Sequence, residues 1–122
     1  MTRTLTFALL LLVSTLPAKA DDLKDWKEKF LHNFAYMLVA QERCSKWQIN
    51  KSKVVQVLRF FKARNEDIEP GGRDWPILEK YALESQKKFA GLDENAACSM
   101  AELMYGPHGN VSSGFMIPTG AK

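Results

Sequence analysis

Apolar residues recur every three or four positions through most of this chain, a spacing that places them on one face of an α-helix. The pattern predicts four helices, over about residues 22–44, 51–64, 74–90 and 93–105. The first has the longest apolar face, made by Leu23, Trp26, Phe30, Phe34 and Met37, with Gln41 in line. Charged residues fill its opposite side, so we expect an amphipathic helix whose aromatic residues enter a core. A membrane-surface helix is the alternative, and the acids at its start argue against it.

Residues that cap or end helices support these limits. The predicted caps are Asn50 or Ser52, Asp74 and Asp93, and the predicted ends are Gly91 and Gly106-Pro107. Three valines in the second segment would also permit a strand over 54–61, but the three-four spacing and the cations along it favour a helix.

Two segments lack helical periodicity. Residues 65–73 form a loop with three acids, Glu66, Asp67 and Glu69, which lack the ligand ladder of a calcium-binding hand and are expected to be solvated. Residues 107–122 form an irregular tail rich in Gly, Ser and Pro, except for the apolar run Phe115, Met116 and Ile117. This run either docks back onto the helices or binds a partner, and it is the candidate partner-binding segment.

The first 20 residues are typical of a secretory signal peptide. They combine a positive start, an apolar run over Phe7–Val13 and the small-residue cleavage pattern Ala18-Lys19-Ala20. The apolar run is shorter than the roughly 20 residues that span a bilayer. We therefore expect cleavage before Asp21, no stable membrane anchor afterwards, and a periplasmic or secreted protein. An uncleaved anchor is the alternative.

Removal of the signal peptide changes the charge balance. It carries two of the 17 Lys and Arg residues and none of the 14 Asp and Glu residues, so the mature chain has a net charge of +1. No run of five cations is present, and nucleic acid is not an expected partner. The mature length suits one domain, which we place at 21–106, followed by the tail.

Two cysteines, Cys44 and Cys98, occur in a chain predicted to enter an oxidising compartment. In an up-down bundle the first helix ends and the fourth begins at the same end, so the two thiols would meet. The predicted fold is therefore all-α: a four-helix up-down bundle stapled by a Cys44–Cys98 disulfide, with an irregular C-terminal tail. A loop of this length would stabilise the fold by roughly 4 kcal/mol in the chain-entropy model.

Catalytic motifs are not evident in the sequence. It contains no Cys-x-x-Cys, no haem-attachment motif, no Gly-rich phosphate loop and no nucleophile elbow. Glu28 and His32 lie one helical turn apart and could offer a metal two ligands, whereas closed sites use four. We predict no metal, no cofactor and no enzymatic activity.

The segment from Ala97 to Gly109, with Cys98 and the turn Tyr105-Gly106-Pro107-His108-Gly109, resembles the ending of small exported alphaproteobacterial proteins. These place a cysteine about seven residues before a Tyr-Gly-Pro-x-Gly turn and another cysteine near the end of the first helix. Their function is uncharacterised, so the resemblance implies export and a disulfide but no activity. A looser similarity, in size and topology alone, links the chain to periplasmic acid-stress chaperones.

The function expected from the sequence is that of a small, soluble, non-enzymatic periplasmic protein that binds a protein partner. One alternative is an acid-stress chaperone or scaffold, in which protonation of the 14 carboxylates exposes apolar faces. The other is a metal or small-ligand carrier that uses Glu28, His32 or the acidic loop.

Overall fold

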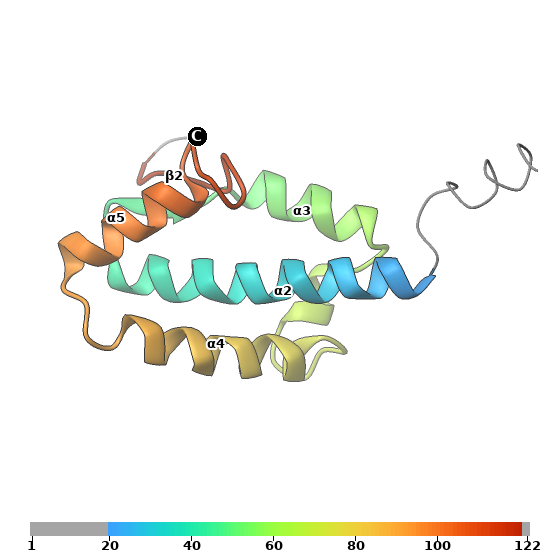
Figure 1. Ribbon diagram of the computed structural model, residues 1–122. Helices are drawn as coiled ribbons and strands as arrows, with labels where there is room; N and C mark the ends of the chain where they lie inside the picture. Colours follow the sequence, from blue (N-terminus) through green and yellow to red (C-terminus); the bar gives the residue numbers. More distant parts are fainter. Residues whose placement is uncertain (1–19, 121–122) are drawn as a thin grey trace, which may run out of the picture.

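The computed structural model describes residues 20–120, and the side chains of residues 23–120. It contains four α-helices, one short 3-10 helix and a two-stranded sheet (Figure 1). The helices are α2 (Ala20–Arg43), α3 (Lys51–Phe60), α4 (Trp75–Phe89) and α5 (Glu94–Tyr105), the 3-10 helix is η1 (Asn65–Ile68), and the strands are β1 (Trp47–Ile49) and β2 (Met116–Pro118). The four predicted helices are confirmed. The predicted signal peptide lies almost entirely outside the described residues.

The long helix α2 is the centre of the molecule. It packs most extensively against α4 and next against α5, and Figure 1 shows α4 on one side of α2 with α3 and α5 on the other. The expected up-down arrangement, in which each helix packs on the next, is not confirmed, because the main interface joins α2 to α4. α3 makes few close backbone contacts with any other described element.

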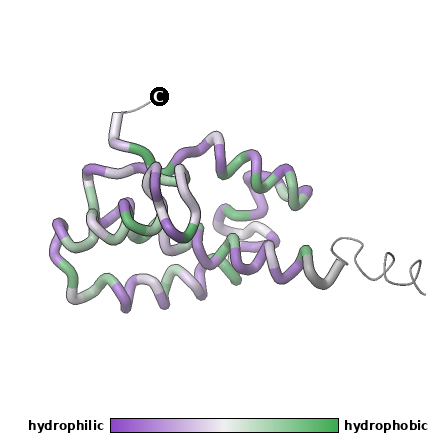
Figure 2. Tube along the Cα trace, turned by 45° about the horizontal axis from the view of Figure 1, so that its top comes forward, coloured by the Kyte–Doolittle hydropathy of each residue, from purple (hydrophilic) through white to green (hydrophobic). Residues whose placement is uncertain are grey.

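The central position of α2 explains its burial. Hydrophobic and hydrophilic positions alternate along the helices (Figure 2), but α2 is buried on two sides and not on one stripe. Tyr36, which the spacing places on the polar side, is buried between Phe89 and Tyr105, whereas Leu23 and Trp26 of the predicted apolar face are exposed. The buried face of α2 consists of Leu31, Phe34, Ala35, Tyr36, Met37, Val39 and Ala40.

The β1–β2 sheet was not expected from the sequence. The two strands pair antiparallel, with Gln48 opposite Ile117 and Ile49 opposite Met116. The Asn50 N–H donates to the Phe115 carbonyl oxygen at 2.7 Å, which extends the ladder to the start of α3. Otherwise the tail, as far as residue 120, consists of irregular turns and bends, as predicted.

Helix caps are confirmed at two of three sites. Asn50 and Asp93 accept hydrogen bonds from the N–H groups of Lys53 and Ala96. Asp74 precedes α4 as predicted, but its side chain makes no capping bond. It is buried and lies 2.8 Å from Lys27 Nζ of α2, as an ion pair without hydrogen-bond geometry. The predicted cap is therefore a link between the two main helices.

The second helix is shorter than predicted because the chain reverses at Lys62. Its φ of 56° lies in the left-handed region, and it is the only residue other than glycine with positive φ in the described part of the chain. The Ala63 N–H donates to the Leu58 carbonyl oxygen at 2.8 Å, a bond typical of a helix that ends with a left-handed residue. α3 therefore ends at Phe60 instead of Arg64.

The turn after α5 has a clear backbone role. The carbonyl oxygens of Leu103 and Met104 accept hydrogen bonds from the N–H groups of Asn110 and Val111. A side chain on Gly109 would place its Cβ 2.5 Å from the Met104 carbonyl oxygen. Glycine is required here because the chain crosses directly over the last turn of the helix.

Candidate functional site

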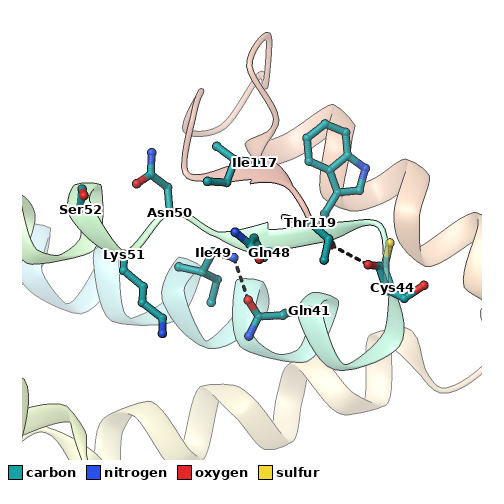
Figure 3. Close-up of a pocket in the computed structure, with 11 residues that line it drawn as sticks. Gln41, Cys44, Gln48, Ile49, Asn50, Lys51, Ser52, Ile117 and Thr119 are labelled. Atoms are coloured by element: carbon teal, nitrogen blue, oxygen red, sulfur yellow. Dashed lines mark hydrogen bonds between the residues drawn. The ribbon is translucent and has the colours of Figure 1, made fainter. Parts of the chain in front are cut away.

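Two hollows adjoin on the surface around β1 and the start of α3. The first, the polar hollow, has a volume of about 580 Å³ and lies where the end of α2 meets the sheet (Figure 3). Its walls carry hydroxyl and amide side chains beside a few apolar ones. The lining residues are Gln41, Cys44, Ser45, Trp47, Gln48, Ile49, Asn50, Lys51, Ser52, Ile117 and Thr119.

The second, the apolar hollow, has a volume of about 610 Å³ and lies between α2, α3, η1 and the start of α4. Here the backbone of α3 makes few close contacts with α2 or α4, although its Val54 and Leu58 side chains are buried in the core. Its lining residues are Phe34, Leu38, Gln41, Ile49, Lys51, Val54, Val55, Asn65, Ile68, Glu69, Pro70, Trp75 and Leu78.

The two adjoining hollows have Gln41, Ile49 and Lys51 in common in their walls, and we refer to the pair as the groove. The Ile49 N–H donates to Gln41 Oε1 at 2.7 Å, a bond that holds β1 against α2. Lys51 is exposed, and its ammonium has no ion pair within residues 23–120. Figure 3 shows the Lys51 and Asn50 side chains pointing to opposite sides of the chain. The groove thus has an apolar part and a polar part with a cation at their junction.

The chemistry of this groove suits binding. Its polar groups are amides, hydroxyls, one ammonium and the Glu69 carboxylate, and neither histidine of the chain lines it. Within the described residues, no group of three or more His, Cys, Asp and Glu side chains could hold a metal ion. These groups can orient a bound molecule by hydrogen bonds while the apolar walls exclude water from it.

The predicted Cys44–Cys98 disulfide is confirmed. It joins the residue after α2 to the second turn of α5, with the two Cα atoms 5.1 Å apart. Two hydrogen bonds flank it: Ser45 Oγ donates to Glu94 Oε1 at 2.8 Å, and Thr119 Oγ1 donates to the Ser45 carbonyl oxygen at 2.6 Å. The bridge therefore stabilises the wall of the polar hollow.

The candidate partner-binding segment packs back onto the rest of the domain. Docking of this kind is one of the two possibilities that the sequence left open for it. Met116 is completely buried in the core. Ile117 lines the polar hollow, and the Phe115 ring lies 6.4 Å from the Phe30 ring. The sequence pattern could not assign these three separate positions, and a role of the segment in binding a partner stays a prediction.

The side chains considered for a metal have other partners. The Tyr81 hydroxyl donates to Glu28 Oε1 at 2.7 Å, and the His32 ring stacks on Tyr81 with centroids 4.3 Å apart. The hydrogen bond to Glu28 is the main cause that raises the pKa of Tyr81 above its ordinary value. These contacts connect α2 to α4.

The acidic loop is organised around Asp67. Its carboxylate accepts a hydrogen bond from the Arg64 N–H at 2.9 Å and pairs with Arg73 at 3.3 Å. The backbone hydrogen bond, with nearby cations, lowers the pKa of Asp67. Asp67 therefore holds the loop together, and Glu69 of the same loop reaches the rim of the apolar hollow.

The groove could not be found from the sequence, because its lining residues come from α2, β1, α3, η1, α4 and β2. The sequence offers one sign of a strand beside the groove, namely the alternation of apolar and polar residues in Trp47-Gln48-Ile49. Comparison with protein-family models, with curated proteins and with solved structures found no match to this chain.

Proposed function

We propose that this protein is a non-enzymatic binding protein that holds apolar side chains of a protein partner in the groove beside β1. The observation that carries the proposal is the apolar hollow of about 610 Å³, which is open to the surface in a domain of this size. Binding pockets commonly have volumes of roughly 300–1,000 Å³ and apolar walls with a few polar groups.

The distribution of polar groups supports a partner with a mixed surface. Trp75 and Phe34 provide aromatic surface inside the apolar hollow, and Lys51, Asn65 and Glu69 lie at its rim. An apolar centre surrounded by polar groups is the usual anatomy of a protein interface. Ile117 connects the candidate partner-binding segment to the same groove through the polar hollow.

The proposed location is the periplasm, after removal of the signal peptide. The Cys44–Cys98 disulfide supports a compartment in which thiols are oxidised. None of the helices within residues 20–120 is long and apolar enough to cross a membrane.

Site-specific photocrosslinking in the native host tests the proposal. A benzophenone side chain placed at Val55, which lines the apolar hollow, is expected to crosslink to a defined partner protein. The matched control is the same side chain at Leu83, an exposed apolar residue of α4 outside the groove. Leu38→Asp, at the opposite wall, should abolish the product formed at Val55. No product at Val55, or the same products from both positions, would contradict the proposal.

A further inference from the structure

The cations of this chain are unevenly distributed. Residues 51–64, which comprise α3 and the turn that follows it, carry five Lys and Arg residues and no Asp or Glu. The five are Lys51, Lys53, Arg59, Lys62 and Arg64. Since the predicted mature chain has a net charge of only +1, the residues outside 51–64 together carry a net negative charge.

An exposed aromatic residue lies within this basic segment. Phe60, the last residue of α3, is 62% exposed and lies between Arg59 and the Phe61-Lys62 pair. The two other most exposed large apolar residues have acidic neighbours instead: Leu83 precedes Glu84, and Leu103 follows Glu102. Trp26, the other large aromatic residue exposed within residues 23–120, lies between Asp25 and Lys27, so an exposed aromatic ring with cations and no adjacent acid distinguishes this end of α3.

The exposed Phe60 ring packs against the Phe61 ring, which in turn lies near α2. The Phe60 and Phe61 rings meet edge to face with centroids 5.1 Å apart, and the Phe61 ring lies 6.4 Å from Phe30 of α2. Phe61 thus ties the end of α3 to the central helix and leaves Phe60 outside. We name Arg59, Phe60, Phe61 and Lys62 the basic aromatic patch.

Lys62, in the turn that ends α3, is exposed and has a left-handed backbone conformation. Its left-handed conformation is one that glycine adopts without strain and that a side chain makes unfavourable. Lys62 and Arg59 are exposed and make no ion pair within residues 23–120, whereas Arg64 pairs with Glu66 at 3.6 Å. The left-handed residue that ends α3 therefore carries an exposed cation without an ion pair close to Phe60 in the sequence.

We propose that the basic aromatic patch docks on the surface of an anionic phospholipid bilayer. The Phe60 ring would enter the headgroup region, and Arg59 and Lys62 would lie against lipid phosphates. Cations and aromatic rings are the side chains that favour this interface.

The membrane surface is a separate site from the groove. The groove is lined by Lys51, Val54 and Val55 of the first half of α3, whereas the patch occupies its last turn and the turn that follows. The proposal therefore does not depend on the proposed protein partner, and the two can fail independently.

Co-sedimentation with vesicles tests the proposal, using the exported protein as its host processes it. Binding is expected to vesicles of phosphatidylcholine mixed with phosphatidylglycerol, to weaken as salt is raised, and to be lost with phosphatidylcholine alone. Lys62→Gly removes one charge and relieves the left-handed strain, so it should lower the affinity about fivefold without lowering the melting temperature. Phe60→Ser should also lower it.

The matched control is Leu83→Ser with Lys87→Gln, which removes an exposed apolar residue and an exposed cation from α4. This control should bind vesicles as the unaltered protein does. The proposal is overturned by equal binding to both vesicle types, or by a loss in the control as large as that of Lys62→Gly. Binding of polyglutamate through Arg59 and Lys62 without any vesicle binding would assign the patch to an acidic protein and also overturn it.

Discussion

Buried polar contacts of single residues connect α2 to its neighbours. Tyr105 of α5 has no exposed surface, and its hydroxyl donates to Asn33 Oδ1 of α2 at 2.7 Å. The Asn33 amide donates in turn to the Lys29 carbonyl oxygen at 3.0 Å. Burial raises the pKa of Tyr105 well above its ordinary value, because the phenolate would lose its hydration.

Removal of this hydroxyl is predicted to reduce stability. Tyr105→Phe removes the hydrogen bond between a fully buried tyrosine and the half-buried Asn33, so the free energy of unfolding at neutral pH should fall by about 1 kcal/mol in a urea titration. Tyr81→Phe is the comparison, with a smaller expected loss because Tyr81 is itself partly exposed, whereas Tyr105 is buried.

The same substitution should change the response to alkaline pH. Since the pKa of Tyr105 is higher in the folded state, its contribution to stability is complete below the unfolded value near 10.0 and is lost as pH rises above that value. The Tyr105→Phe variant should therefore lose less stability above pH 10 than the unaltered protein. An equally steep loss in both would contradict the role given to this burial.

The elements are joined mainly by the α2–α4 interface. Asp74 at the start of α4 is buried, and Lys27 of α2 is its closest cation, at 2.8 Å. Arg73 lies farther away, at 3.7 Å, and is largely exposed. Because the Asp74 side chain caps nothing, its main role is this contact between two helices.

A double-mutant cycle tests that role. Lys27→Met should lower the free energy of unfolding by about 3 kcal/mol, since it leaves a buried carboxylate without its main partner. Lys27→Met with Asp74→Leu should recover most of this loss, because the uncompensated charge is gone. A loss in the single variant below about 1 kcal/mol, the value of an exposed pair, would show that the ion pair does not hold α4 on α2.

Elements with local signals could be predicted from the sequence, and those with distant partners could not. The four helices follow from the three-four spacing, and Asn50 and Asp93 mark two of their starts correctly. β1 and β2 have three residues each, too few for a periodic pattern, and each depends on a strand about 70 positions away. Asp74 shows the same limit, since its ion pair exists only once α2 and α4 meet.

At the scale of the whole molecule, the disulfide and the sheet close the polar end of the groove. Cys44–Cys98 joins the end of α2 to α5 across 54 positions, and β2 holds β1 beside it. The cysteine pairing was predictable from the order of the helices, because it needed only that two helix ends coincide. The groove was not, because its walls come from segments far apart in the chain, and the sequence does not indicate how these segments meet.

The three tryptophans allow a direct test of the apolar hollow. Trp75 lines it, Trp47 lines the polar hollow, and Trp26 is 49% exposed on α2 outside the groove. Two variants that keep one tryptophan each, Trp75 or Trp26, with phenylalanine at the other two positions, can be titrated with bromobenzene. This small apolar probe quenches tryptophan fluorescence only at contact.

The measurement is therefore the quenching curve of the variant that keeps Trp75, compared with the variant that keeps Trp26. If the apolar hollow receives apolar groups, quenching of Trp75 should saturate, whereas quenching of Trp26 should rise weakly and linearly. Val55→Phe, which fills the hollow, should remove the saturation. Linear quenching of Trp75, with the slope seen for Trp26, would contradict the claim that this groove is a binding site.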